Sequence, residues 1–329
     1  MRIIVTGASG FVGLNVVEAA LARGEEVVAA ADTPLPAEAL AAFARLPGRL
    51  RVETLDVVDA AAVRGLFERH RPQTLFHGAA LTPGPLQERE RAARTLQVNI
   101  AGTAIVLDAA ARVGVERVVY PSSVAVYGTN AFSGGLLDEE TTVPQPQTIY
   151  AITKYAGEKT ALRFREIAGL NIVAARLGQV FGPWERETGV RETLAPMWQI
   201  LSLAERGEEA VLPRRCARDF VYSRDVAGAV LALLDRRDAE PAIVNVGPGR
   251  VWAVEEWCAE AARALPGLRW RLARPGEAGN VNLHGDRDRA AVAVHRLTGA
   301  VGFTPTFFLA ESARDYAEWW QQTLRGRRG

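Results

Sequence analysis

The chain has 329 residues and a formal net charge of +1, which gives no general attraction to nucleic acid or an anionic membrane. The spacing of its two cysteines, Cys216 and Cys258, indicates neither a zinc site nor a disulfide framework, so we expect a reducing compartment and no bound metal. Met1 leads directly into the apolar run at 3–5, and no apolar run reaches about 20 residues, so we predict a cytoplasmic protein without a signal peptide or membrane span.

Short apolar runs alternate with longer helical patterns in the first half of the chain, which is typical of β-α-β units around a parallel sheet. The predicted strands are residues 3–5, 26–31, 51–54, 74–77, 117–120 and 171–175, and the predicted helices include 11–22, 60–69, a long one around 88–113, and about 150–166. Beyond Gly182 segments 184–191, 211–218 and 274–286 interrupt shorter helices. The pattern predicts an α/β fold with a Rossmann-type doubly wound parallel sheet.

A glycine-rich turn, Thr6-Gly7-Ala8-Ser9-Gly10-Phe11-Val12-Gly13, follows the first predicted strand. Gly7 permits a tight reversal, Gly10 lets the backbone approach a pyrophosphate, and Gly13 lets the helix pack closely on the sheet. The alternative is a plain turn before a helix that tolerates glycine. The position after the first strand favours a dinucleotide, and the predicted cofactor-binding residues here are Gly7, Ser9, Gly10, Phe11, Val12 and Gly13.

Asp32 ends the second predicted strand, about 20 residues beyond the turn, where a carboxylate can accept hydrogen bonds from the adenosine ribose. The same charge repels a 2′-phosphate, and the next residues, Thr33, Pro34 and Leu35, add no basic group. We therefore predict NAD rather than NADP as cofactor. The alternative role of Asp32 is a helix cap or a loop acid.

Tyr150 and Lys154 are four residues apart at the start of a predicted helix, so their side chains leave one helical face. A nearby ammonium favours the phenolate and lowers the pKa of a tyrosine from about 10. Tyr150 can then take a proton from a substrate hydroxyl while the neighbouring carbon loses hydride. A surface pair of tyrosine and lysine is the alternative interpretation.

With these motifs the chain resembles the extended short-chain dehydrogenase/reductases of the NAD-dependent epimerase/dehydratase family. The further matching segments, in family order between residues 3 and 247, are Asp56-Val57, His77-Gly78-Ala79-Ala80, Val98-Asn99-Ile100-Ala101-Gly102-Thr103, Ser122-Ser123-Val124-Ala125-Val126-Tyr127-Gly128, Arg176-Leu177-Gly178-Gln179-Val180-Phe181-Gly182-Pro183 and Arg218-Asp219-Phe220-Val221-Tyr222. The resemblance implies an NAD-binding Rossmann domain at 1–177, to which about 219–247 return. It implies that 178–329 mainly form a smaller C-terminal substrate-binding lobe.

The same resemblance implies roles for single residues. Ser123, four residues before Tyr127, is the catalytic serine that orients the reacting oxygen, and Lys154 also holds the nicotinamide ribose. Further cofactor-binding residues are Asp56 and Val57 beside adenine, the lining residues Ala79, Ala80 and Leu81, Asn99, and the catalytic pair Tyr150 and Lys154. For Asn99 a structural hydrogen bond that bends the helix is an equal alternative. Implied substrate-binding residues are Thr82, Ser123, Val124, Gln179 and Arg218.

Departures from the family pattern bear on the substrate. Val124 and Ala125 stand where sugar dehydratases of this family carry an acidic pair, which argues against dehydration. Relatives that act on nucleotide sugars carry other motifs at three places, which are Gln179, residues 193–196 and residues 213–215 of this chain. These differences weaken the prediction that the substrate contains uridine diphosphate. Arg218 can meet a phosphate or a carboxylate. Nearby arginines that add positive charge, or are simply solvated, are Arg186, Arg191, Arg214 and Arg215.

We predict an NAD-dependent oxidoreductase that interconverts a secondary alcohol and a ketone on an anionic sugar or sugar-derived substrate. A nucleotide-sugar epimerase, which returns the hydride to the opposite face of a keto intermediate, is the alternative. A non-catalytic NAD-sensing protein is a third hypothesis, since a fold does not establish an activity. By resemblance we expect a homodimer formed through the helices around 88–113 and 150–166.

Overall fold

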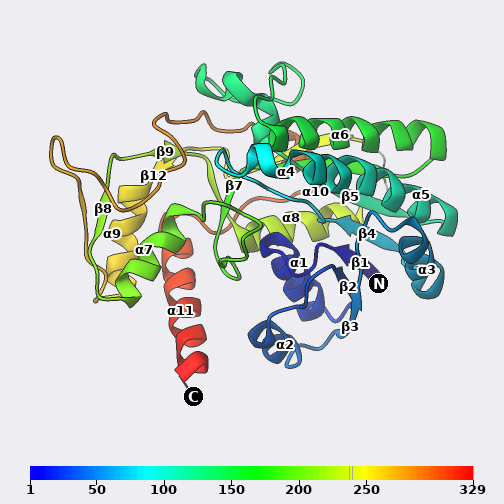
Figure 1. Ribbon diagram of the computed structural model, residues 1–329, viewed down its shortest axis with the longest axis horizontal. Coiled ribbons are helices and arrows are strands. Elements are labelled where there is room, and N and C mark those ends of the chain that lie inside the picture. Colours follow the sequence, from blue (N-terminus) through cyan, green and yellow to red (C-terminus); the bar gives the residue numbers. More distant parts are fainter. Residues whose placement is uncertain (237, 239, 329) are drawn as a thin grey trace.

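The computed structural model describes residues 1–236, 238 and 240–328, and its centre is a seven-stranded sheet with the order β11-β6-β5-β4-β1-β2-β3 (Figure 1). All neighbouring strands in it are parallel. The strands are β1 (Arg2–Thr6), β2 (Glu26–Ala31), β3 (Arg49–Thr54), β4 (Thr74–His77), β5 (Arg117–Ser123), β6 (Ile172–Leu177) and β11 (Ile243–Val246). The predicted α/β class and doubly wound parallel sheet are confirmed.

Helices cover both faces of this sheet because its strands are apolar on both sides. Ile3 and Val5 face one layer, whereas Ile4 faces the other. The first layer contains α1 (Phe11–Ala22), α2 (Ala37–Phe43) and α8 (Ser223–Asp235). The second contains α3 (Ala60–His70), α5 (Thr103–Val113) and α6 (Ile149–Ala168).

The long helix predicted around 88–113 is present but has three parts. They are α4 (Glu88–Leu96), a π-helical turn η1 (Gln97–Gly102) and α5. By length and composition alone, the stretch Glu88–Val113 is the one described helix that is apolar enough to cross a membrane, yet 44 % of that window is buried in the protein. Its second half packs against α3 and α6, as a core helix of the sheet unit does.

The smaller lobe lies beside the sheet and contains α7, α9 and α11 (Figure 1). Its elements are β8 (Ala210–Leu212), β9 (Ala217–Arg218), β12 (Trp252–Ala253), β13 (Trp270–Leu272), α7 (Pro196–Glu205), α9 (Val254–Ala264) and α11 (Leu309–Arg328). An aromatic cluster around Phe181, Tyr222, Trp257 and Tyr316 fills its core. The remaining elements are β7 (Gln179–Phe181), β10 (Phe220–Tyr222), α10 (His295–Val301) and the 3₁₀ segment η2 (Val124–Phe132). After β10 the chain returns to the sheet as α8 and β11.

Buried polar contacts fix α6 on the edge of β5 and β6. The Glu158 carboxylate forms an ion pair with Nε and Nη2 of Arg176 and accepts a hydrogen bond from Ser122 at 2.7 Å. Gly157 allows the close approach, because a Cβ there would lie 2.1 Å from the Tyr120 hydroxyl. Since the Glu158 and Arg176 side chains are 0 % and 2 % exposed, each needs the other to offset its lost hydration.

Glu158→Gln should therefore lower the free energy of unfolding by about 3–5 kcal/mol, because it leaves the Arg176 guanidinium buried without a counter-ion. Denaturant unfolding followed by circular dichroism measures the change. Glu166→Gln is the matched control on the same helix, since the Glu166 and Arg163 side chains are both 66 % exposed. That control should change stability by less than about 0.5 kcal/mol. Equal losses in the two variants would contradict the assignment.

Candidate active site

The glycine turn after β1 has the backbone geometry that an approaching anion requires. Gly7 has φ +65°, and a Cβ there would lie 2.6 Å from the backbone nitrogen of Ala79. A Cβ on Gly13 would lie 2.2 Å from the Gly7 carbonyl oxygen, so α1 packs directly on the turn. At Gly10 the only described atom within reach of a Cβ is that same oxygen, at 3.2 Å. Among the described residues no side chain caps the N-terminus of α1, so its first amides are available to an anion.

The other residues predicted to bind the cofactor follow the carboxyl ends of the neighbouring strands. Asp32 is exposed after β2, and the Ser9 hydroxyl is hydrogen-bonded to that of Thr33 at 2.8 Å. Asp56, after β3, accepts from the Val58 amide and pairs with Arg94 at 2.6 Å. Burial alone would raise the pKa of Asp56, but these two bonds and the Arg94 charge outweigh it and lower the pKa. This edge of the sheet is where a doubly wound fold binds its ligand, so the residues present fit NAD.

Asn99 acts on the segment that lines this edge. Its side chain accepts from the Leu81 amide at 2.8 Å and donates to the Leu81 carbonyl and to the Thr153 hydroxyl, both at 2.9 Å. Asn99 lies in the π-helical turn, where a Cβ on the neighbouring Gly102 would come within 2.8 Å of Val57. Both side-chain donors of Asn99 are therefore used inside the protein, and it holds Ala79, Ala80 and Leu81 in place.

Hydrogen bonds of His77 and Thr6 support the same segment, residues 79–81. The His77 ring bonds the Thr6 hydroxyl at 2.8 Å and the Thr103 hydroxyl at 3.0 Å, and Thr6 also accepts from the Ala79 amide. Burial and the charge of Lys154 lower the pKa of His77 to about 3. The ring is therefore neutral at physiological pH and structural in this site.

Ser123 and Tyr150 meet at the end of β5. The Ser123 hydroxyl caps η2 by accepting from the Ala125 amide at 3.1 Å, and its interaction with the Tyr150 phenol lowers the pKa of that phenol. Thr148 caps α6 through the Ala151 amide, so the helix begins immediately before Tyr150. The sequence placed these two residues in separate elements, and the fold brings their hydroxyls together.

The electrostatics differ from the expectation drawn from the sequence. Burial raises the pKa of Tyr150 above 10, and the Ser123 hydrogen bond and the Arg191 charge only partly oppose it. Lys154 instead donates to the Pro121 carbonyl at 2.9 Å and lies 5.4 Å from the centre of the Tyr120 ring. Burial lowers the pKa of Lys154 to about 8. Lys154 is not among the groups that lower the pKa of Tyr150 in this structure, so its effect on that pKa stays a prediction for the protein with NAD bound.

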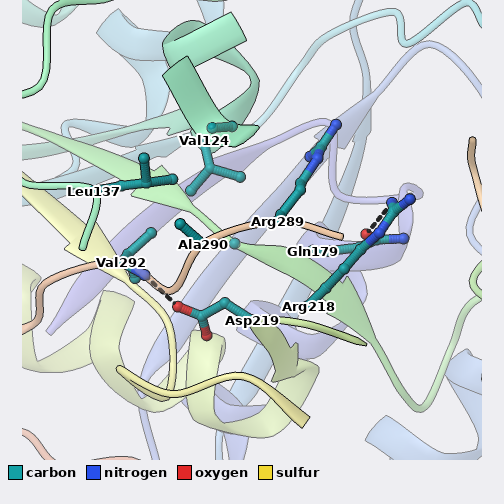
Figure 2. Close-up of a pocket in the computed structure, with 10 residues that line it drawn as sticks. Val124, Leu137, Gln179, Arg218, Asp219, Arg289, Ala290 and Val292 are labelled. Atoms are coloured by element: carbon teal, nitrogen blue, oxygen red, sulfur yellow. Dashed lines mark hydrogen bonds between the residues drawn. The ribbon is translucent and has the colours of Figure 1, made fainter. Parts of the chain in front are cut away.

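One pocket is lined in part by Val124, the residue that directly follows the predicted catalytic Ser123 in the chain (Figure 2). Three of the predicted substrate residues line it together, Val124, Gln179 and Arg218. Thr82 lies elsewhere, where it forms a β-bridge with Arg191 and donates to the Val190 carbonyl at 3.3 Å. The other lining residues are Ala131, Leu137, Gly178, Asp219, Arg289, Ala290 and Val292.

Two arginines in this pocket lack carboxylate partners among the described residues. Arg218 donates to the Gln179 side chain at 3.0 Å and to the carbonyls of His284 and Arg287, and its Nε is buried without a partner. Arg289 also has a buried, unpartnered Nε, and its guanidinium lies 5.6 Å from the Phe132 ring centre. Burial and the charge of Arg218 lower the pKa of Arg289 to about 10. Figure 2 shows the two side chains extending in the same direction. Such a pair suits an anionic group.

The other arginines named from the sequence have different places. Arg214 pairs with Asp288, and Arg215 pairs with Glu255 at 2.5 Å. Arg191 pairs with the buried Glu185 at 2.6 Å, and its charge lowers the pKa of both Tyr150 and His284. Arg186 donates to the Ser9 carbonyl at 3.0 Å, next to the glycine turn.

Sequence reasoning missed Arg289 and Asp219 as pocket residues. Asp219 accepts from the Val292 amide at 2.5 Å, and burial raises its pKa to about 7. Its place in the Arg218-Asp219-Phe220 motif was a usable signal for Asp219. Arg289 stands in the charged run 286–289, where nothing local separates it from Arg287. Arg289 differs from Arg287 in its tertiary contacts. The backbone amide of the next residue, Ala290, donates to the Ala131 carbonyl at 3.0 Å, and this places Arg289 beside η2.

Comparison with known proteins agrees with this geometry. The model of the "NAD dependent epimerase/dehydratase family" matches residues 3–247. Sterol demethylase protein B of Methylococcus capsulatus is 33 % identical over 72 % of this chain and 66 % of its own length. UDP-glucuronate 4-epimerase 4 of Arabidopsis thaliana is 31 % identical over 71 % of this chain.

The chain thus spans about half to two thirds of the length of these curated relatives, since the match covers 54 % of the Arabidopsis protein. The solved structure of MoeE5 in complex with UDP-glucose and NAD is similar to the whole fold. It has a TM-score of 0.77 and 29 % identity, and the match covers 98 % of this chain and 100 % of that one.

The buried Lys154 predicts a specific dependence of stability on pH. Its pKa is about 8 in the folded protein and 10.5 ordinarily, so below pH 8 the fold bears the full cost of the buried ammonium. As the pH rises to 10.5 the folded protein loses this proton before the unfolded chain does. Wild type should gain about 3 kcal/mol relative to Lys154→Met over this range.

Urea unfolding at a series of pH values measures this difference. In the folded protein His77, whose pKa is about 3, and Tyr120, whose pKa burial raises, do not titrate in the interval, and the unfolded-state titration of Tyr120 is common to wild type and variant. Lys159→Met is the control on the same helix, because water solvates the exposed Lys159 ammonium. A difference between wild type and Lys154→Met that stays constant from pH 8 to 10.5 would refute the assignment.

Proposed function

The chain belongs to the NAD dependent epimerase/dehydratase family, and from this we propose that it interconverts a secondary alcohol and a ketone on a small anionic, sugar-derived substrate. It is an NAD-dependent enzyme of the extended short-chain dehydrogenase/reductase type. The names of its relatives refer to different substrates, a sterol and nucleotide sugars. Because these names do not agree, the substrate class is inferred from the residues of the site. The observation that carries the proposal is the interaction of Ser123 with Tyr150 beside a pocket whose two arginines lack a carboxylate partner among the described residues.

The chain's own groups supply the proton chemistry. When bound, NAD accepts the hydride from the carbinol carbon. As a phenolate, which the positive charges of Lys154 and of the oxidised nicotinamide would favour, Tyr150 would take the hydroxyl proton of the substrate, and Ser123 would orient the same oxygen. In the reverse direction Tyr150 returns the proton to the ketone oxygen, and its raised pKa keeps the phenol protonated for that step at neutral pH. Lys154, anchored on the Pro121 carbonyl, holds a positive charge one helical turn from Tyr150 below about pH 8.

Arg218 and Arg289 support the anionic character of the substrate. Val124 directly follows Ser123 and lines the same pocket as both arginines, so an anion held there lies on the path to the catalytic serine. A buried cation without a carboxylate partner is unfavourable until a ligand supplies the opposite charge. A carboxylate or a phosphate monoester fits this requirement.

The segment 280–284 favours a small substrate over one that carries a nucleoside. Asn280 bonds the backbone of Val211 in β8 in both directions, at 2.7 and 3.0 Å, and Gln199 in α7 bonds the backbone of Asn282 in the same way. The segment ends at His284, whose carbonyl accepts from Arg218 at 2.8 Å. The protein's own atoms therefore occupy the polar edges of β8 and α7 next to the arginine pair.

A nucleotide-sugar epimerase is the second candidate, and the similarity to UDP-glucuronate 4-epimerase 4 and to MoeE5 favours it. The same Ser123 and Tyr150 would act twice on one substrate, with no net reduction of NAD. We also propose a homodimer formed through the helices around 88–113 and 150–166, and a cytoplasmic location for the protein. Exposed apolar residues on or beside these helices, Leu96, Ile152 and Ile167, support that face as the interface.

The reaction is tested by incubating purified protein and NAD with sugar acids, sugar phosphates, free sugars or nucleotide sugars. Formation of the reduced nicotinamide is followed by its absorbance. We expect reduction with at least one sugar acid or sugar phosphate. Epimerisation of a nucleotide sugar without net reduction, detected by NMR of the product, would instead establish the second candidate. Absence of turnover with every class would contradict both.

Tyr150→Phe should lower the turnover rate by about 10²–10⁴-fold while NAD still binds, because it removes the group that transfers the proton. Tyr155→Phe, one turn further along α6, is the matched control and should keep the wild-type rate. NAD binding is measured by calorimetry for both variants. Function that survives Tyr150→Phe unchanged would make the protein a non-catalytic NAD sensor.

Arg289→Gln should raise the KM for the anionic substrate by about ten- to hundredfold, because it removes a charged hydrogen bond of about 1.5–3 kcal/mol. It should not lower the melting temperature, because it removes a buried cation that has no described carboxylate partner. Arg215→Gln is the control, since Arg215 is 66 % exposed and paired with Glu255. An unchanged KM for Arg289→Gln would exclude this residue from the anion site.

A further inference from the structure

The segment Gly182–Arg186 lies on the first turns of α1, the helix that begins in the glycine turn. The Asn15 amide of α1 donates to the Pro183 carbonyl at 2.8 Å, and Trp184 donates to the Glu18 carboxylate at 2.9 Å. Trp184 has φ +69°, a conformation that non-glycine residues adopt only when their surroundings hold them there. Its ring packs 5.6 Å from that of Phe43 in α2. These contacts fix the position of the next side chains relative to the turn.

Three successive side chains leave this segment in different directions. Trp184 reaches α1 and α2, whereas Glu185 is buried against Arg191 and the Ala195 amide. Arg186 reaches the glycine turn, where its Nη2 donates to the Ser9 carbonyl at 3.0 Å. Its Nη1 is buried and has no hydrogen-bond partner among the described residues. One nitrogen of the fork is therefore anchored on the turn, and the other remains available beside it.

We propose that Arg186 is a cofactor-binding residue whose Nη1 donates to a phosphate oxygen of the NAD diphosphate. The uncapped N-terminus of α1 and the absence of a side chain at Gly10 already favour an anion at this place. A diphosphate carries more charge than one helix end compensates, and a guanidinium fork anchored at one nitrogen is oriented in advance for the other. Burial lowers the pKa of Arg186, and the Glu38 charge partly opposes this.

This role links the cofactor to the substrate side of the protein. Arg186 follows β7, which carries Gln179 of the pocket, and precedes Arg191, whose charge acts on Tyr150. A phosphate held by Arg186 thus also holds the backbone that positions both residues.

The test is Arg186→Met, with binding of NAD, ADP and adenosine measured by calorimetry or competition. We expect affinity for NAD and ADP to fall about ten- to hundredfold, because one charged hydrogen bond is lost, and affinity for adenosine to stay unchanged. The dependence of ADP affinity on salt should also become weaker. Arg186→Lys should recover part of the affinity, since it keeps the charge but not the fork.

Arg23→Met is the matched control, because Arg23 lies just after α1 and pairs with Asp235 on the surface. It should leave all three affinities at the wild-type value. Unchanged affinity of Arg186→Met for NAD and ADP would overturn the proposal. An equal loss for adenosine would also overturn it, since the substitution would then act by disturbing the turn rather than by removing a phosphate contact.

Discussion

The docking of α6 onto the ends of β5 and β6 is the constraint on which the active site depends. Glu158 holds Arg176 and Ser122, Lys154 holds the Pro121 carbonyl, and Gly157 lets the helix approach Tyr120. All of these contacts are buried and polar, so a shift of the helix by one residue would leave charges unpaired. The depth and rotation of α6 are thereby fixed, and with them the position of Tyr150 relative to Ser123.

Burial also determines the charge of the groups in and below the site. Desolvation lowers the pKa of Lys154 and His77 and raises that of Tyr150. The phenol of Tyr150 is therefore protonated and the imidazole of His77 is neutral at physiological pH. A phosphate at Arg186 or an anion at Arg289 would accept from guanidinium nitrogens that have no hydrogen-bond partner among the described residues.

The glycine-rich turn, the pocket and the lobe are connected through the chain that follows β6. This chain crosses α1 at Pro183 and Trp184, sends Arg186 to the turn, and reaches Thr82 through Arg191. Because each of these contacts joins residues far apart in sequence, cofactor and substrate regions share one piece of backbone. After the lobe segments that follow β7, the chain returns to the sheet, where α8 packs against it and β11 pairs with β6.

The sequence by itself determined the features that depend on local spacing. Alternating apolar runs located the first six strands to within two or three residues, and the turn at Gly7–Gly13 and the Tyr150–Lys154 pair were readable because helix geometry and backbone freedom are local properties. The tertiary structure decided which distant residues share an environment. Arg218 and Arg289 are 71 positions apart, and only long-range packing brings them into one pocket. The direction of the Tyr150 pKa likewise follows from burial, which no local spacing reveals.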